Sequence, residues 1–112
     1  MTGGLSNSGT IVATSGGANS TSAILINNNA VTTSITNSGT LQGDNGAYGI
    51  KIDSAFTGDI KNTTGTITTD SQTALYLGDV TLTGGIINSG TINITDGASP
   101  NSAVLATGAN SK

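Results

Sequence analysis

Apolar and polar residues alternate along this chain in short segments, and the segments recur at a nearly fixed spacing. The most regular segment reads aliphatic, any residue, Asn, Ser or Thr, Gly, Thr, aliphatic, and it occurs four times. Its copies begin at Leu5, Ile35, Ile60 and Ile86, which are 30, 25 and 26 residues apart, and the third copy carries one extra residue. A repeat of this length is typical of stacked architectures, in which each unit covers the open face of its neighbour.

Two further segments complete each period. The second covers residues 23–26, 49–52, 74–77 and 103–106, and the third covers residues 31–33, 56–58 and 80–82. Alternation with a period of two residues indicates β-strands, and the abundant Ile, Val and Thr favour extended backbone. The sequence therefore predicts an all-β fold, a parallel β-helix (β-solenoid) with three short strands per turn and about four turns of about 25 residues. We expect one domain over residues 1–112.

The alternation also predicts which side chains fill the interior. In the repeated block these are Leu5, Ile11, Ile35, Leu41, Ile60, Ile67, Ile86 and Ile92. In the second segment they are Ile24, Ile26, Ile50, Ile52, Leu75, Leu77, Val104 and Ala106, while Leu25, Lys51, Tyr76 and Leu105 face outward. In the third segment Val31, Phe56 and Val80 face inward, and Thr32, Thr57 and Thr81 stack outside. Each buried apolar side chain contributes roughly 1.5–3 kcal/mol.

The Asn of the repeated block occupies the same place in every period. Asn tolerates left-handed backbone and bonds its own turn, and stacked Asn amides bond to one another as in cross-β ladders. The Gly that follows permits a tight corner. We therefore interpret these residues as a structural ladder with no catalytic role, made of Asn7, Asn37, Asn62 and Asn88.

Composition narrows the classes of function. The chain has 3 Lys, no Arg, 6 Asp and no Glu, a net charge of −3, and only 8% charged residues. Such a surface offers no basic footprint for nucleic acid or anionic lipid, and its weak self-repulsion permits association with copies of itself. The chain has no Cys and thus no disulfide framework. No apolar stretch is long enough for membrane insertion. The regularly placed aliphatic residues argue against disorder, which this composition would otherwise allow.

Catalytic and metal sites have little support. With no His and no Cys, a Ser-His-Asp or Cys-His arrangement is impossible. Three acids recur 26 residues apart: Asp44, Asp70 and Asp96. We interpret them first as turn residues, since Asp44-Asn45-Gly46 is a turn sequence. The second interpretation is a calcium site between stacked corners, and the third is a pair of carboxylates acting on polysaccharide. We expect no enzyme, no cofactor and no resident metal.

The outward threonines raise one more alternative, an ice-binding face. Such a face would show regular Thr-x-Thr ranks, and Thr33, Gly58 and Leu82 interrupt them.

The Asn-Ser-Gly-Thr-Ile block, the following Ala-Ile-x-Ile segment and the period near 25 residues resemble the repeats of bacterial autotransporter passenger domains and related cell-surface β-solenoid adhesins. The resemblance runs from Leu5 to Ala106. It implies a right-handed parallel β-helix at an extracellular or bacterial cell-surface location, and it brings no catalytic residues. The residues Met1-Thr2-Gly3-Gly4 do not read as a signal peptide, and no translocator barrel is visible. We expect a fragment or subunit of a longer stack.

Two functional hypotheses follow. The first is a non-enzymatic surface protein, a stalk or adhesin passenger segment, whose partner is a host surface or a glycan. The alternative is an extracellular fibre subunit that self-associates through the solenoid ends, because uncapped turns expose unpaired strand edges. Neither hypothesis involves nucleic acid or membrane insertion.

Overall fold

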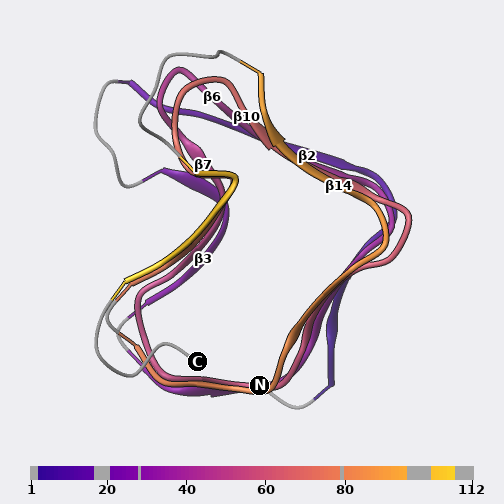
Figure 1. Cartoon of the computed structure of the whole chain (residues 1–112), viewed down its shortest axis with the longest axis vertical. Coiled ribbons are helices and arrows are strands. Elements are labelled where there is room, and N and C mark those ends of the chain that lie inside the picture. The colour runs from indigo at the N-terminus through magenta and orange to yellow at the C-terminus, as the bar shows by residue number, and fades with distance from the viewer. Residues whose placement is uncertain (1–2, 17–20, 28, 79, 96–101, 108–112) are drawn as a thin grey trace.

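The computed structural model describes residues 3–16, 21–27, 29–78, 80–95 and 102–107, and these residues form short β-strands joined by turns, with no helix. The paired strands are parallel, and each pairs with strands one period away. The predicted β-solenoid is thus confirmed. We call one circuit of the chain a coil. Three coils are complete, strands β13 to β15 belong to a fourth, and successive coils superimpose when viewed along the axis (Figure 1).

Two of the sheets contain the repeated block. Sheet A comprises β1 (Leu5–Asn7), β5 (Ile35–Asn37), β9 (Ile60–Asn62) and β13 (Ile86–Asn88). Sheet B comprises β2 (Thr10–Thr14), β6 (Thr40–Asp44), β10 (Thr66–Thr69) and β14 (Thr91–Ile94).

The other two sheets contain the second and third segments of the period. Sheet C comprises β3 (Ser22–Ile26), β7 (Tyr48–Ile52), β11 (Leu75–Leu77) and β15 (Val104–Ala106). Sheet D comprises β4 (Val31–Thr32), β8 (Phe56–Thr57) and β12 (Leu82–Thr83).

A complete coil therefore has four strands, where the sequence predicts three. The difference arises in the repeated block, which the sequence analysis treats as one strand. Strand β1 ends at Asn7 and β2 begins at Thr10, so the chain turns a corner at Ser8 and Gly9. The same corner recurs between β5 and β6, β9 and β10, and β13 and β14. The small residues predicted to allow a tight turn thus divide the block between two sheets.

The register of sheet D also differs from the prediction. The sequence analysis aligns Val80 with Phe56, whereas the structure pairs Leu82 with Phe56. Corner glycines explain the shift of two residues. Gly58 and Gly84 share a φ of 138°, and a Cβ on Gly84 would lie 2.0 Å from the carbonyl oxygen of Gly58. Because only glycine fits this backbone and this close approach, the two glycines stack and set the register.

The outer threonine column changes accordingly. It consists of Thr32, Thr57 and Thr83, and the prediction of Thr81 in this column is wrong. All three threonines of the column are exposed.

The core consists of matched aliphatic columns. The predicted inward residues of the second and third coils are buried: Ile35, Leu41, Ile50, Ile52, Phe56, Ile60, Ile67, Leu75, Leu77 and Val80, and Ile24 of the first coil is buried with them. The predicted inward residues that are half-buried or exposed belong to the first and fourth coils: Leu5, Ile11, Ile26, Val31, Ile86, Ile92, Val104 and Ala106. Within the described residues, a strand of either coil has a neighbouring strand on one side only.

Candidate functional site

The asparagines of the repeated block form a continuous ladder along the corner between sheets A and B. The Nδ2 of Asn7 donates to Oδ1 of Asn37 at 2.8 Å, and that of Asn37 donates to Oδ1 of Asn62 at 2.8 Å. Asn62 continues the series by donating to Asn88 at 2.8 Å. Every bond runs in the same direction, from a coil to the next coil in the chain. The ladder therefore has a polarity, with an acceptor end at Asn7 and a donor end at Asn88.

Each amide also closes its own corner. The Nδ2 of Asn37 donates to the carbonyl oxygen of Gly39 at 3.0 Å and to that of Thr66, in the next coil, at 3.3 Å. Asn62 does the same with Gly65 at 3.0 Å and Thr91 at 3.1 Å. Asn37 and Asn62 are buried, so these bonds satisfy polar atoms that water cannot reach.

The backbones of successive coils approach so closely at the corner between sheets A and B that the last corner residue must be glycine. A Cβ on Gly39 would lie 2.0 Å from the carbonyl oxygen of Gly9, and a Cβ on Gly90 would lie 2.2 Å from that of Gly65. Real Cβ atoms do not come so close to backbone atoms, so a side chain here would force the coils apart. The Asn and the Gly of the block thus act together, one bonding neighbouring coils and the other letting them approach.

A second corner lies between sheets B and C, where the sequence places its column of acids. Asn45 has a φ of 55° and Gly46 a φ of 87°, as the Asn-Gly turn sequence predicts. The side chain of Asn45 donates to the carbonyl oxygen of Ser15 at 2.6 Å. Its backbone N–H donates to Oδ2 of Asp70 at 2.7 Å, and the N–H of Gly46 donates to Oδ1 of Asp70 at 3.3 Å. One turn therefore links three successive coils.

These contacts bear on the calcium interpretation. The carboxylate of Asp70 holds the turn of the preceding coil, whereas that of Asp44 accepts a hydrogen bond from Gln42 of its own strand at 2.8 Å. Asp96 lies outside the described residues. Within the described part of the chain, no group of three or more His, Cys, Asp or Glu side chains is placed to hold a metal ion.

The same bonds control the ionisation of Asp70. Burial raises the pKa of its carboxyl, but hydrogen bonds from the N–H groups of Asn45 and Gly46, together with Ser71, favour the charged form and outweigh it. The folded-state pKa of Asp70 therefore lies below its ordinary value of 3.8. A carboxyl with a lowered pKa stabilises the fold fully above its unfolded-state pKa, and this contribution is lost as pH falls through the folded-state pKa.

We expect Asp70→Asn to lower the free energy of unfolding at pH 7 by about 0.5–1 kcal/mol, because the amide offers one uncharged acceptor oxygen where the carboxylate offers two charged ones to the N–H groups of Asn45 and Gly46. The difference between the variant and the original chain should shrink as pH falls below about 4, since the original carboxyl then becomes protonated. Urea denaturation at several pH values measures this. Asp44→Asn is the matched control, because its carboxylate has a hydrogen-bond donor in its own strand. A difference that stays constant down to pH 2 would contradict the assignment.

The outer face of sheet C carries an aromatic and charged cluster. The rings of Tyr48 and Tyr76 lie 5.3 Å apart between centroids and are tilted by 48°. The Nζ of Lys51 lies 5.2 Å from the Tyr48 centroid and 5.6 Å from that of Tyr76, and it pairs with Oδ2 of Asp53 at 3.0 Å. We call these four residues the outer cluster. The sequence predicts Lys51 and Tyr76 in one outward column, but it misses Tyr48, which precedes the predicted strand.

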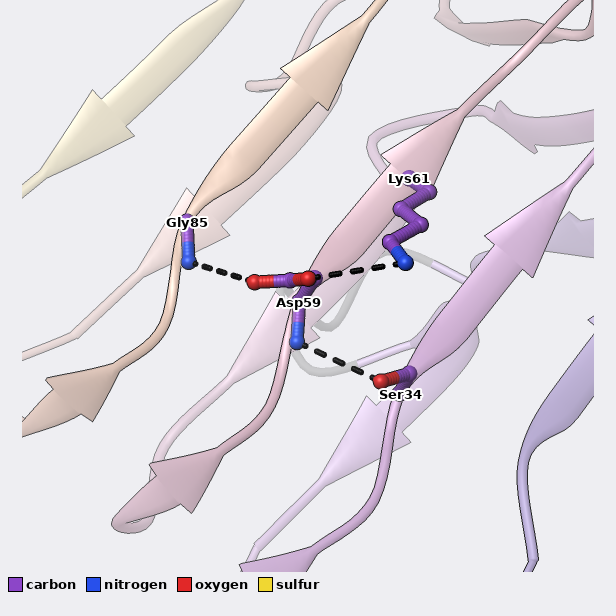
Figure 2. A network of polar contacts seen from close by, with 4 residues as sticks. All are labelled: Ser34, Asp59, Lys61 and Gly85. Atoms are coloured by element: carbon purple, nitrogen blue, oxygen red, sulfur yellow. Dashed lines mark hydrogen bonds and ion pairs between the residues drawn. The ribbon is translucent and has the colours of Figure 1, made fainter.

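A third inter-coil contact lies between sheets D and A (Figure 2). The N–H of Asp59 donates to Oγ of Ser34 at 3.4 Å, and its carboxylate accepts from the N–H of Gly85 at 3.0 Å. The same carboxylate lies 3.5 Å from the Nζ of Lys61, and both of these side chains are more than a third exposed. The ion pair therefore contributes at most about 1 kcal/mol. The hydrogen bonds again tie three successive coils together.

The fold and the ladder define the chain as a parallel β-solenoid repeat protein. No protein-family model, no curated protein and no solved structure matches it. The resemblance to autotransporter passengers and surface adhesins stays a prediction from the repeat itself. None of the described residues belongs to a helix long and apolar enough to cross a membrane.

Proposed function

We propose that this chain is a non-enzymatic structural β-solenoid of the bacterial cell surface, acting as a stalk or as an adhesive passenger segment. The supporting observation is that the repeated residues make the contacts between neighbouring coils. The Asn, Gly and aliphatic positions of the block all join one coil to the next, through the ladder, the close corner and the core. A sequence repeated for these contacts builds a scaffold that lengthens with every added coil, and its function then lies in that length and in the outer faces.

The outer cluster supports the adhesive form of this proposal. Among the described residues, most exposed ones are Thr, Ser or Asn, whereas the outer face of sheet C presents two tyrosine rings beside a lysine and an aspartate. Aromatic rings cover the apolar face of a sugar, and neighbouring charged groups bond its hydroxyls; Tyr is also enriched where proteins meet. A glycan or a polar protein surface is thus the chemistry that fits this face.

We expect the purified chain to bind a subset of immobilised glycans or host-cell surface proteins, and Tyr48→Ala/Tyr76→Ala to weaken that binding by about tenfold or more. The reason is that truncation removes both rings that offer apolar contact area. Thr57→Ala, on the exposed column of sheet D, is the matched control and should leave binding unchanged. Surface labelling of the producing bacterium with an antibody tests the location. Absence of labelling together with no binding by the natural protein would contradict the proposal.

The alternative function is a fibre subunit that polymerises through its ends. Its supporting observation is that core positions in the first and fourth coils are open to solvent. Strand edges and apolar columns in this state favour addition of further coils. The two functions are compatible, since a stack of subunits also forms a stalk.

A further inference from the structure

We propose that a second copy of this chain docks head-to-tail on the fourth coil, so that its strands β1, β2 and β3 become the next strands after β13, β14 and β15. This inference rests on the fibre-subunit alternative of the proposed function and specifies its partner, polarity and register. The proposed junction involves sheets A, B and C, because in each of these sheets the structure describes one strand from every one of the four coils.

The open core positions at the two ends are the first support. Ile86 is 37% exposed, whereas the equivalent Ile60 is 1% exposed. In sheet B Ile11 is 37% exposed against 0% for Leu41, and in sheet C Val104 is 41% exposed against 0% for Leu75. Covering these positions removes apolar side chains from water, which favours association by about 25 cal/mol for each Å² covered.

The ladder supplies the polarity. Asn88 has its donor end free to continue the series, because its Nδ2 bonds only to Gly90 of its own corner among the described contacts, at 3.2 Å. At the other end, Oδ1 of Asn7 accepts a hydrogen bond from the N–H of Gly9 in its own corner at 3.2 Å. In Asn37 and Asn62 the same oxygen also accepts a hydrogen bond from the Asn side chain of the preceding coil. A docked copy thus places Asn7 as the acceptor for Asn88, as Asn37 is for Asn7.

The backbone repeats this complementarity. The N–H of Thr40 donates to the carbonyl oxygen of Gly9 at 2.8 Å, and that of Thr91 donates to Gly65 at 2.9 Å. In the docked pair, the equivalent hydrogen bond runs from the N–H of Thr10 in the second copy to the carbonyl oxygen of Gly90 in the first. The end blocks match closely in sequence, since both read Asn-Ser-Gly-Thr-Ile, at residues 7–11 and 88–92, without the extra residue of the third copy.

Gly9 supplies the steric fit. A Cβ on Gly39 or Gly90 would collide with the coil before it, but a Cβ on Gly9 would meet nothing within 4 Å. Because Gly9 has no side chain, the backbone of a docked coil can approach it as closely as the backbone of Gly9 approaches Gly39. Because the two ends differ, the contact is heterologous, and repeated docking gives an open filament instead of a closed dimer.

Two variants each block one end. Gly9→Ala adds a Cβ that is free in the single chain but would collide with Gly90 of a docked copy. Asn88→Asp keeps the acceptor for Asn62 at 2.8 Å but can no longer donate, and it sets a carboxylate against Oδ1 of Asn7. We expect the original chain to form filaments at rising concentration, and each variant to raise the threshold concentration by about 10- to 100-fold.

Mixing the variants tests the polarity. The Gly9→Ala chain keeps a competent fourth coil, and the Asn88→Asp chain keeps a competent first coil. An equimolar mixture should therefore give one-to-one dimers and no filaments, because both outer ends of the dimer are blocked. Analytical ultracentrifugation and electron microscopy measure this, with circular dichroism checking that each variant is folded. Thr57→Ala, which alters an exposed outward side chain of the second coil, away from both ends, is the control for lateral association and should leave filaments unchanged.

The contrary outcomes are distinct. Filaments that form equally from either variant overturn the head-to-tail register while leaving a fibre function in place. An original chain that stays monomeric up to its solubility limit overturns both the register and the fibre alternative, but not the adhesive proposal. If the intact mass of the natural protein shows further coils of the same polypeptide on these ends, docking of a second copy is also overturned.

Discussion

Asn37→Ala is expected to lower the free energy of unfolding by about 3–5 kcal/mol, a large part of the 5–15 kcal/mol that stabilises a typical domain. The side chain is buried, and it joins two coils by bonds of 2.8 Å on either side. Its removal takes the donor away from Oδ1 of Asn62 and from two corner carbonyl oxygens, and it takes the acceptor away from Asn7. Buried polar atoms left without partners cost about 1–3 kcal/mol each.

Asn88→Ala is the matched control for this prediction. The residue type and corner are the same, but Asn88 is exposed and has a described ladder neighbour on one side only. Water replaces the lost bond, so we expect a loss of about 1 kcal/mol or less. Both variants should be measured by urea denaturation at low protein concentration, where single chains predominate. Equal losses in the two variants would show that the ladder adds little to the stack.

The repeat predicts the ladder from sequence because period and chemistry agree there. An Asn at the same place in four units must stack once the units stack, whatever the number of strands per coil. The core columns follow for the same reason, as Ile50 and Leu75 show by pairing directly in sheet C. Handedness and cell-surface location follow from the resemblance alone and remain predictions.

Features that depend on backbone detail could not be predicted in this way. The assignment of Val80 to the Phe56 column is wrong because the register is set by stacked glycines with positive φ, which the apolar pattern does not report. The sequence pattern misses Tyr48 because the predicted strand starts at Gly49. A Cβ on Gly49 would lie 2.7 Å from the side chain of Ile67, so the backbone faces inward there and leaves Tyr48 on the outside.

The contacts of the acidic corner between sheets B and C also could not be predicted in full from the sequence. The turn sequence at Asn45 and Gly46 was predicted, and so was the recurrence of Asp70 one period later. What the sequence does not state is that the acid of one coil bonds the turn of the coil before it. That pairing depends on where loop and strand meet across coils. It makes Asp70 an inter-coil contact, although it resembles a residue of a local turn.

Gly39→Ala should produce the second large effect, a loss of about 3 kcal/mol or more, because the new Cβ would lie 2.0 Å from the carbonyl oxygen of Gly9 and 2.7 Å from the carbonyl carbon of Ser8. Both contacts are backbone atoms, so no side chain can rotate away to make room. The first two coils must separate at the corner. This lengthens the hydrogen bond from the N–H of Thr40 to Gly9, which is 2.8 Å in the structure.

Gly9→Ala tests whether stacking, and not the conformation of the corner, demands the glycine. The two positions share the same place in the block, but the Cβ of an alanine at residue 9 meets nothing within 4 Å. In dilute solution we expect a change within about 0.5 kcal/mol. Urea denaturation gives the energies, and hydrogen exchange at the Thr40 amide reports the corner directly, with faster exchange in Gly39→Ala only. If both alanines destabilise the chain equally, the glycine serves its own turn, and the close approach of coils cannot be the reason for its recurrence.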